Sequence, residues 1–95
     1  MLEHTTNYMD DSGRCRRRLE IGENIFLIRR RLGLTQAQLA EALGCSRHTM
    51  YRVESGEAEL YITQMENLAT ILGVSMSDLL QLRIRHVESA IGSQE

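Results

Sequence analysis

Two short helices are predicted within LTQAQLAEALGCSRHTMYRVESG, residues 34–56. Thr35 begins a T-x-x-Q pattern, a capping box in which each side chain bonds the backbone of the other residue, and it predicts a helix over about 36–43. Ser46 can cap a second helix over about 47–54. The turn between them is short and contains a glycine, so the two helices should meet at a steep angle.

Apolar residues at helical spacing predict three further helices around this pair. Steps of three and four residues from Ile21 indicate one helix, which Gly33 ends. A T-x-x-E box predicts another over about 63–72, and the S-x-x-D box at Ser75 begins a longer one over about 76–91. Five helices joined by short connections predict an all-α fold class, a compact five-helix bundle.

Length and composition agree with one helical domain. The chain has 95 residues, 42% of them hydrophobic and 25% charged, enough to bury a core. Aromatic residues make up only 4% and proline is absent, which favours helices over strands. We divide the chain into a flexible N-terminal arm with a basic cluster (1–18), a domain (19–82), a C-terminal helix (76–91) and a tail (92–95).

Several functional classes lack support in the sequence. No apolar run approaches the roughly 18 residues of a spanning helix, and the N-terminus lacks the apolar core of a signal peptide, so we expect a cytoplasmic protein with no membrane partner. Cys15 and Cys45 are too few for a disulfide framework, and Cys45 with His48 supplies only two of about four zinc ligands. We therefore expect no metal and no cofactor. No paired carboxylates, activated nucleophile or phosphate-binding glycine loop is present, which argues against an enzyme.

Charge is distributed unevenly along the chain. Residues 14–52 contain nine arginines and three glutamates, a net charge of +6, whereas residues 53–95 contain two arginines and seven acidic residues, a net charge of −5. The overall charge of −2 therefore conceals a basic block that suits an anionic partner. All 11 basic residues are arginine, whose guanidinium can bind phosphate or guanine in a bidentate manner.

Residues 21–80 resemble the Cro/repressor-type (XRE-like) family of helix-turn-helix transcription regulators. The matching segments are RRRLGLTQAQLA at 29–40, GCS at 44–46, VESG at 53–56 and LATILGVS at 68–75. The resemblance implies a lambda-repressor-like DNA-binding domain whose second short helix enters the major groove of double-stranded DNA. It further implies a sequence-specific transcription regulator, a repressor that binds a palindromic operator as a homodimer.

The resemblance also implies roles for individual residues. Gln36 matches a glutamine that contacts phosphate and steadies the first residues of the second short helix (the recognition helix). A helix N-terminus also presents free N–H groups to an anion. Arg47 and Arg52 match specificity positions, where arginine binding to guanine discriminates by about 1–3 kcal/mol. His48 and Tyr51 can contact phosphate or a thymine methyl group, with a half-buried position as the alternative for Tyr51. The expected DNA contacts are Thr35, Gln36, Ser46, Arg47, His48, Thr49, Tyr51, Arg52 and Ser55.

Some residues are expected to have structural roles or depart from the family pattern. Arg29 and Glu54 match an ion pair between the first helix and the end of the recognition helix. Residues 57–59 read Glu-Ala-Glu where relatives carry basic residues, so this loop should repel phosphate and leave the backbone N–H groups of Ser55 and Gly56 as contacts. The basic cluster 14–18 either follows the DNA or extends the first helix as a solvated surface.

The predicted helix 76–91 suggests a dimer interface. Leu80, Ile84, Val87 and Ile91 recur at steps of four, three and four, a seam of about two heptads that can pair two folded domains. Helix-turn-helix dimers bind half-sites about 34–36 Å apart. The alternative is that this apolar stripe packs on its own domain.

Two other functions fit the same domain. One is an antitoxin, which would bind a toxin or other protein partner and repress its own operon. The other is a restriction-modification controller protein. A neighbouring gene for a toxin, or for a methylase or endonuclease, would distinguish them.

Overall fold

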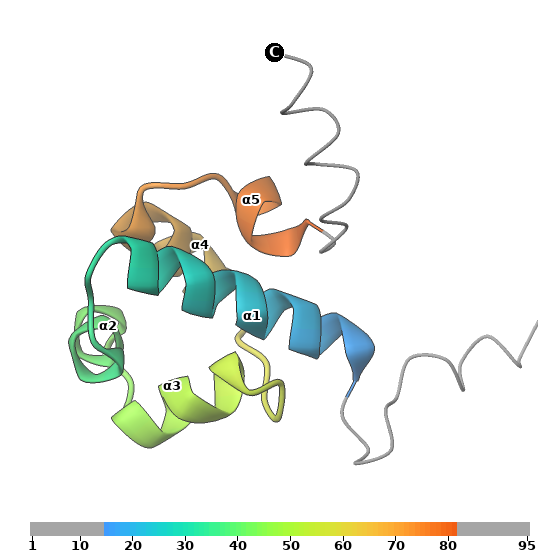
Figure 1. Ribbon diagram of the computed structural model, residues 1–95, viewed down its shortest axis with the longest axis horizontal. Coiled ribbons are helices and arrows are strands. Elements are labelled where there is room, and N and C mark those ends of the chain that lie inside the picture. The colour runs from blue at the N-terminus through green and yellow to red at the C-terminus, as the bar shows by residue number, and fades with distance from the viewer. Residues whose placement is uncertain (1–14, 82–95) are drawn as a thin grey trace, which may run out of the picture.

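Residues 15–81 are described by the computed structural model, and they form five helices. These are α1 (Arg16–Arg31), α2 (Gln36–Leu43), α3 (Arg47–Glu54), α4 (Ile62–Leu72) and α5 (Met76–Leu80). Figure 1 shows α1 crossing the middle of the molecule, with α3 on one side of it and α5 on the other. The predicted all-α fold class is confirmed. No helix within residues 15–81 is long and apolar enough to cross a membrane.

Each helix contributes one fully buried side chain to the core. These side chains are Ile25, Leu39, Met50, Leu68 and Leu79, from α1 to α5 in order. Burying a side chain of this size contributes about 1.5–3 kcal/mol relative to leaving it exposed. All five helices therefore converge on one core, and α3 is attached to it by its inner face.

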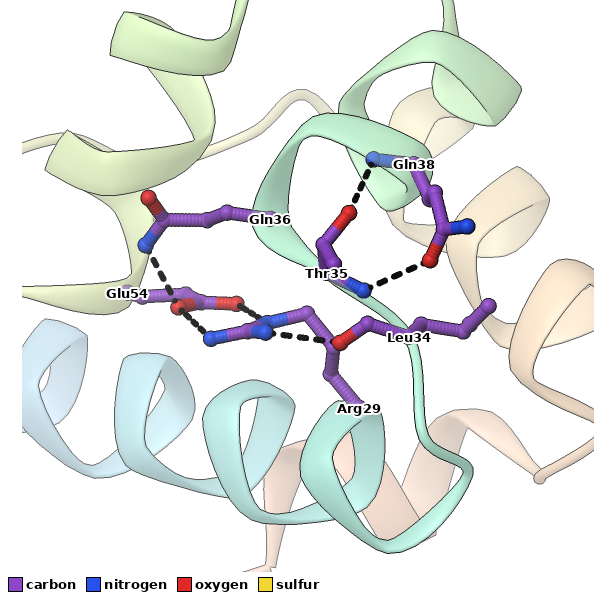
Figure 2. A network of polar contacts seen from close by, with 6 residues as sticks. All are labelled: Arg29, Leu34, Thr35, Gln36, Gln38 and Glu54. Atoms are coloured by element: carbon purple, nitrogen blue, oxygen red, sulfur yellow. Dashed lines mark hydrogen bonds and ion pairs between the residues drawn. The ribbon is translucent and has the colours of Figure 1, made fainter.

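Local capping signals set the ends of α2 and α3, which lie where the sequence predicts them. The Thr35 hydroxyl accepts from the Gln38 N–H at 3.0 Å, and the Gln38 side chain accepts from the Thr35 N–H at 2.8 Å (Figure 2). Gly44 then ends α2 with φ of 86°, a left-handed conformation that glycine adopts without strain. The Ser46 hydroxyl caps α3 by accepting from the Thr49 N–H at 3.0 Å.

The start of α1 differs from the predicted flexible arm and agrees, for residues 16–18, with the alternative in which the basic cluster extends the first helix. The helix begins at Arg16, so the last three residues of the predicted flexible arm (1–18) are helical. Tertiary contacts hold this first turn, because Arg17 donates to the end of α5 and Arg18 lies 4.0 Å from a carboxylate of the loop before α4. The remainder of the arm, residues 1–14, lies outside the described residues.

The end of α5 also differs, because the predicted helix over 76–91 does not continue past Leu80. Gln81 is extended, with φ of −68° and ψ of 149°. Side chains of α1 bind the carbonyls at this point. Asn24, which is buried, donates to the carbonyls of Leu79 at 2.9 Å and Gln81 at 2.8 Å, and Arg17 donates to that of Leu80. These carbonyls bond to α1 instead of to a further turn of α5.

The predicted dimer seam is affected directly by this early end. Leu80 is half-buried and packs against the core of its own domain, as the alternative interpretation expected. The other three seam residues lie outside the described residues: Ile84, Val87 and Ile91.

The start of α4 is one residue earlier than predicted, and its cap is different. Ile62 is the first residue of the helix, so Thr63 lies within the first turn instead of capping it. The Gln64 side chain accepts from the Tyr61 N–H at 2.9 Å and satisfies this end of the helix. Tyr61 and Ile62 are 79% and 71% exposed, so the turn presents two large apolar side chains to solvent.

Candidate nucleic-acid interface

The outer face of α3 carries the side chains that the sequence predicts to contact DNA. Arg47, His48, Tyr51 and Arg52 are all exposed, whereas Met50 is buried on the inner face. Three of the four line a shallow cavity of about 240 Å³ together with Gln36 of α2. The fold therefore brings predicted contacts from both short helices to one surface.

The relative orientation of α2 and α3 forms this surface. In Figure 1, α2 is seen almost end-on while α3 lies across the view, so their axes are steeply inclined. Met50 and Val53 anchor α3 in the core by their buried side chains. The N-terminus of α2 is thereby placed beside the outer face of α3.

A buried ion pair joins α1 to the last residue of α3. The Arg29 Nε lies 2.6 Å from Glu54 Oε2, and its Nη2 donates to Glu54 Oε1 at 3.0 Å. Both side chains are almost fully buried, with 8% and 4% of their surface exposed. Arg29 Nη1 also donates to the Leu34 carbonyl at 2.8 Å, so the guanidinium connects three segments (Figure 2). A desolvated bidentate pair of this kind fixes the position of α3 relative to α1.

Gln36 extends this network from α2. Its Nε2 donates to Glu54 Oε1 at 2.9 Å, and Figure 2 shows its side chain directed at that carboxylate. The sequence predicts a phosphate contact for Gln36, whereas its amide is here bonded to the end of α3. Gln36 thus couples the two short helices to each other through Glu54.

A family model described as a helix-turn-helix domain matches residues 20–82. The chain belongs to the helix-turn-helix family. The family and fold that the sequence resemblance implied are therefore confirmed. A comparison with curated protein sequences finds no match.

Three solved structures, two of regulatory proteins and one of an enzyme, are similar to this chain. A hypothetical transcription factor, NHTF from Neisseria, aligns with a TM-score of 0.69 and 26% identity over 77% of this chain and 84% of that chain. The restriction-modification controller protein C.AhdI from Aeromonas hydrophila aligns with a TM-score of 0.62 and 27% identity over 65% of this chain and 94% of that chain. Hydroxypropylphosphonic acid epoxidase from S. wedmorenis has 32% identity and a TM-score of 0.62 over 65% of this chain, but only 33% of the enzyme is covered.

The cap residues of the helix-turn-helix unit have hydrogen-bond partners within it. The hydroxyl of Thr35 accepts from the backbone of α2, and Ser46 both accepts from the Thr49 N–H and donates to its hydroxyl at 2.9 Å. Thr49 is partly buried as a result. These three predicted contact residues therefore have structural roles in starting the two helices.

The predicted backbone contacts after α3 differ in the structure. The Ser55 N–H donates to the Tyr51 carbonyl at 2.9 Å, and the Gly56 N–H donates to the Val53 carbonyl at 3.2 Å. Both amides are thus used to end α3, and neither is left for a phosphate. The Ser55 hydroxyl donates to the Arg52 carbonyl at 3.2 Å.

The two arginines of the recognition helix have different surroundings. Arg52 Nε lies 3.8 Å from Glu57 Oε1, and its Nη2 donates to the Glu57 carbonyl at 3.4 Å. Arg47 has no ion pair or hydrogen bond to any other described side chain or carbonyl, and it is exposed at the start of α3. The sequence did not predict the ion pair between Arg52 and Glu57. The only signal for it was two opposite charges five residues apart.

The turn between α2 and α3 contains Cys45, whose side chain is partly buried. Burial raises the pKa of its thiol, because the apolar surroundings disfavour the thiolate. Within residues 15–81 no group of three His, Cys, Asp or Glu side chains is placed to hold a metal ion. The surface instead offers guanidinium, imidazole and phenol groups, which suit an extended polyanion.

Proposed function

We propose that this protein is a sequence-specific DNA-binding transcription regulator that inserts α3 into the major groove. The observation that carries the proposal is the division of α3 into two faces. Its inner face is buried through Met50 and Val53, while Arg47, His48 and Tyr51 project from a rigidly anchored outer face. A helix fits the roughly 12 Å width of the major groove, where each base pair presents a distinct pattern of donors and acceptors.

Arg47 is the residue that we assign to direct base readout. Its exposed guanidinium has no competing partner among the described residues, so both of its hydrogen-bonding edges are free to bind the O6 and N7 of guanine. His48 and Tyr51 are assigned to flanking phosphates or thymine methyl groups. The family membership and the likeness to a transcription factor and a controller protein support this assignment.

We further propose that the protein is a repressor that acts as a homodimer on a palindromic operator. One α3 covers a single half-site, and two copies related by a twofold axis would cover both. The apolar residues Ile84, Val87 and Ile91 support a dimer contact that lies beyond α5. A restriction-modification controller is the second candidate, favoured because the alignment with C.AhdI covers 94% of that chain.

Replacement of Arg47 by alanine tests this assignment. A preferred duplex is first selected from a random pool with the native protein, and binding to it and to a shuffled duplex is measured by fluorescence anisotropy. We expect Arg47→Ala to lower the preference for the selected duplex by about 5- to 150-fold, which corresponds to the 1–3 kcal/mol of one bidentate contact. Thermal unfolding should be unchanged, because Arg47 is exposed and has no structural partner.

Arg31→Ala is the matched control for Arg47→Ala. It removes the same charge from an exposed position at the end of α1, so it should affect both duplexes alike. If Arg47→Ala retains the native preference, the assignment of base readout to this residue is wrong. If the native protein selects no duplex at all, the proposed function itself is wrong.

A further inference from the structure

We propose that Glu57 competes with DNA phosphate for Arg52 and thereby sets the affinity and the salt dependence of DNA binding. This inference rests on the proposed function, because it assumes that the outer face of α3 meets DNA. An acidic residue outside the recognition helix would thus lower the affinity for DNA without contacting a base.

The geometry places Glu57 on one particular edge of the Arg52 guanidinium. The Glu57 carboxylate lies 3.8 Å from Nε, and the Glu57 carbonyl accepts from Nη2 at 3.4 Å. Nε and Nη2 form one of the two edges through which an arginine binds phosphate in a bidentate manner. Glu57 therefore occupies an edge that a phosphate would otherwise use.

The pair is weak enough for DNA to displace it. The side chains of Arg52 and Glu57 are 46% and 35% exposed, and their charged atoms are separated by 3.8 Å. An exposed ion pair of this kind contributes about 0–1 kcal/mol, which a phosphate contact can replace. The effect of Glu57 on binding therefore depends on where its carboxylate goes once Arg52 is taken by the DNA.

The backbone prevents Glu57 from moving away. Its N–H donates to the Arg52 carbonyl at 2.8 Å, and the N–H of Ala58 donates to the same carbonyl at 3.2 Å. The loop is thus attached to the last turn of α3, so the carboxylate stays within the length of one side chain of Arg52 whether or not DNA is bound. A phosphate at Arg52 then has a negative charge close by, which costs binding free energy on any DNA sequence.

Glu59 provides a control from the same loop. It carries the same charge two residues further along, is 75% exposed, and faces Arg18 at 4.0 Å instead of the recognition helix. Its removal changes the net charge by the same amount without freeing Arg52. The difference between the two variants therefore isolates the local competition from the general charge of the protein.

The experiment measures binding of Glu57→Gln and Glu59→Gln to the selected and shuffled duplexes over a range of salt concentrations. We expect Glu57→Gln to bind both duplexes about two- to fivefold tighter, as expected when one competing surface pair is lost. The slope of log K against log salt should steepen by up to about 0.9, the value for one phosphate neutralised, because Glu57 no longer offsets the charge of Arg52 at that phosphate. Glu59→Gln should change affinity less and leave the slope as in the native protein.

A double-variant cycle shows whether the gain in DNA affinity of Glu57→Gln depends on Arg52. In the Arg52→Ala background, Glu57→Gln should give no more gain than Glu59→Gln does. An equal gain with and without Arg52, or unchanged or weaker binding by Glu57→Gln, would overturn the inference while leaving the proposed function intact. If the native protein binds no selected duplex, both are wrong. Circular dichroism of each variant verifies that the helices are retained.

Discussion

Glu54 accepts hydrogen bonds from two different helices with one carboxylate. Arg29 of α1 binds both of its oxygens, and Gln36 of α2 binds Oε1. A buried charge with three donors is well compensated, but it depends on each of them because little water reaches it. The last residue of α3 is therefore the point at which three helices are joined by polar contacts.

Removal of the cation from this site should be costly. Arg29→Met leaves Glu54 buried without its counter-charge, so we expect the free energy of unfolding to fall by about 3–5 kcal/mol. Urea denaturation followed by circular dichroism measures this loss. The double variant Arg29→Met/Glu54→Leu removes both charges and should recover most of the stability. A loss below about 1 kcal/mol in the single variant, the value of an exposed pair, would contradict a structural role for Arg29.

The sequence predicted the Arg29–Glu54 pair only through the family resemblance, and it predicted the exposed face of α3 from helical spacing. It could not predict that Gln36 bonds to Glu54, because that contact exists only when the folded core brings α2 against the end of α3. The Arg52–Glu57 pair was missed for a similar reason. Its geometry depends on the course of a loop that the sequence describes only as acidic.

At the scale of elements, α1 and α3 approach each other at a glycine. A Cβ added to Gly22 would lie 2.4 Å from the Val53 carbonyl oxygen and 2.6 Å from that of Glu54. Real Cβ atoms do not approach backbone oxygens so closely, so the two helices would have to separate. The absence of a side chain at this position thus allows the last turn of α3 to rest on α1.

Gly22→Ala should therefore destabilise the protein despite the higher helix propensity of alanine. We expect a loss of about 1–3 kcal/mol from overpacking, which outweighs the roughly 1 kcal/mol that alanine gains in an open helix. Thermal unfolding measures the loss, and weaker binding to the selected duplex would report the displaced α3. A variant as stable as the native protein would show that α1 and α3 tolerate a wider separation.

The elements that the sequence predicted best are those with local signals. A capping box at Thr35, a serine cap at Ser46 and a left-handed glycine determine α2 and α3, and both helices have the predicted bounds. The start of α1 and the end of α5 were wrong because tertiary contacts of Arg17 and Asn24 decide them. Such contacts join residues more than fifty positions apart, and no local pattern indicates them.

At the scale of the whole molecule, the fully buried core of the described residues ends before Leu80, the first residue of the predicted dimer seam. All fully buried apolar side chains of the described residues lie between Ile25 and Leu79. A chain that ends at Gln81 should therefore retain its helices and its cooperative thermal unfolding. We expect it to be a monomer, whereas the full chain should be a dimer if Ile84, Val87 and Ile91 form the interface.

Light scattering of the two chains during size-exclusion chromatography measures both masses. A shortened chain that is still dimeric would place the interface within residues 1–81, where Tyr61 and Ile62 are the large exposed apolar side chains of α4 and its cap. A monomeric full chain at micromolar concentration would contradict the homodimer proposal.

The contacts of α1 have a mechanical consequence. Arg17 and Asn24 bind the end of α5, and Gly22 between them lies against the end of α3. Two turns of one helix therefore connect the end of α5 with the helix proposed to enter the groove. A force applied to the chain after Gln81 would reach these contacts first, and it would be transmitted to α3 through a contact at Gly22 that has no room for a single methyl group.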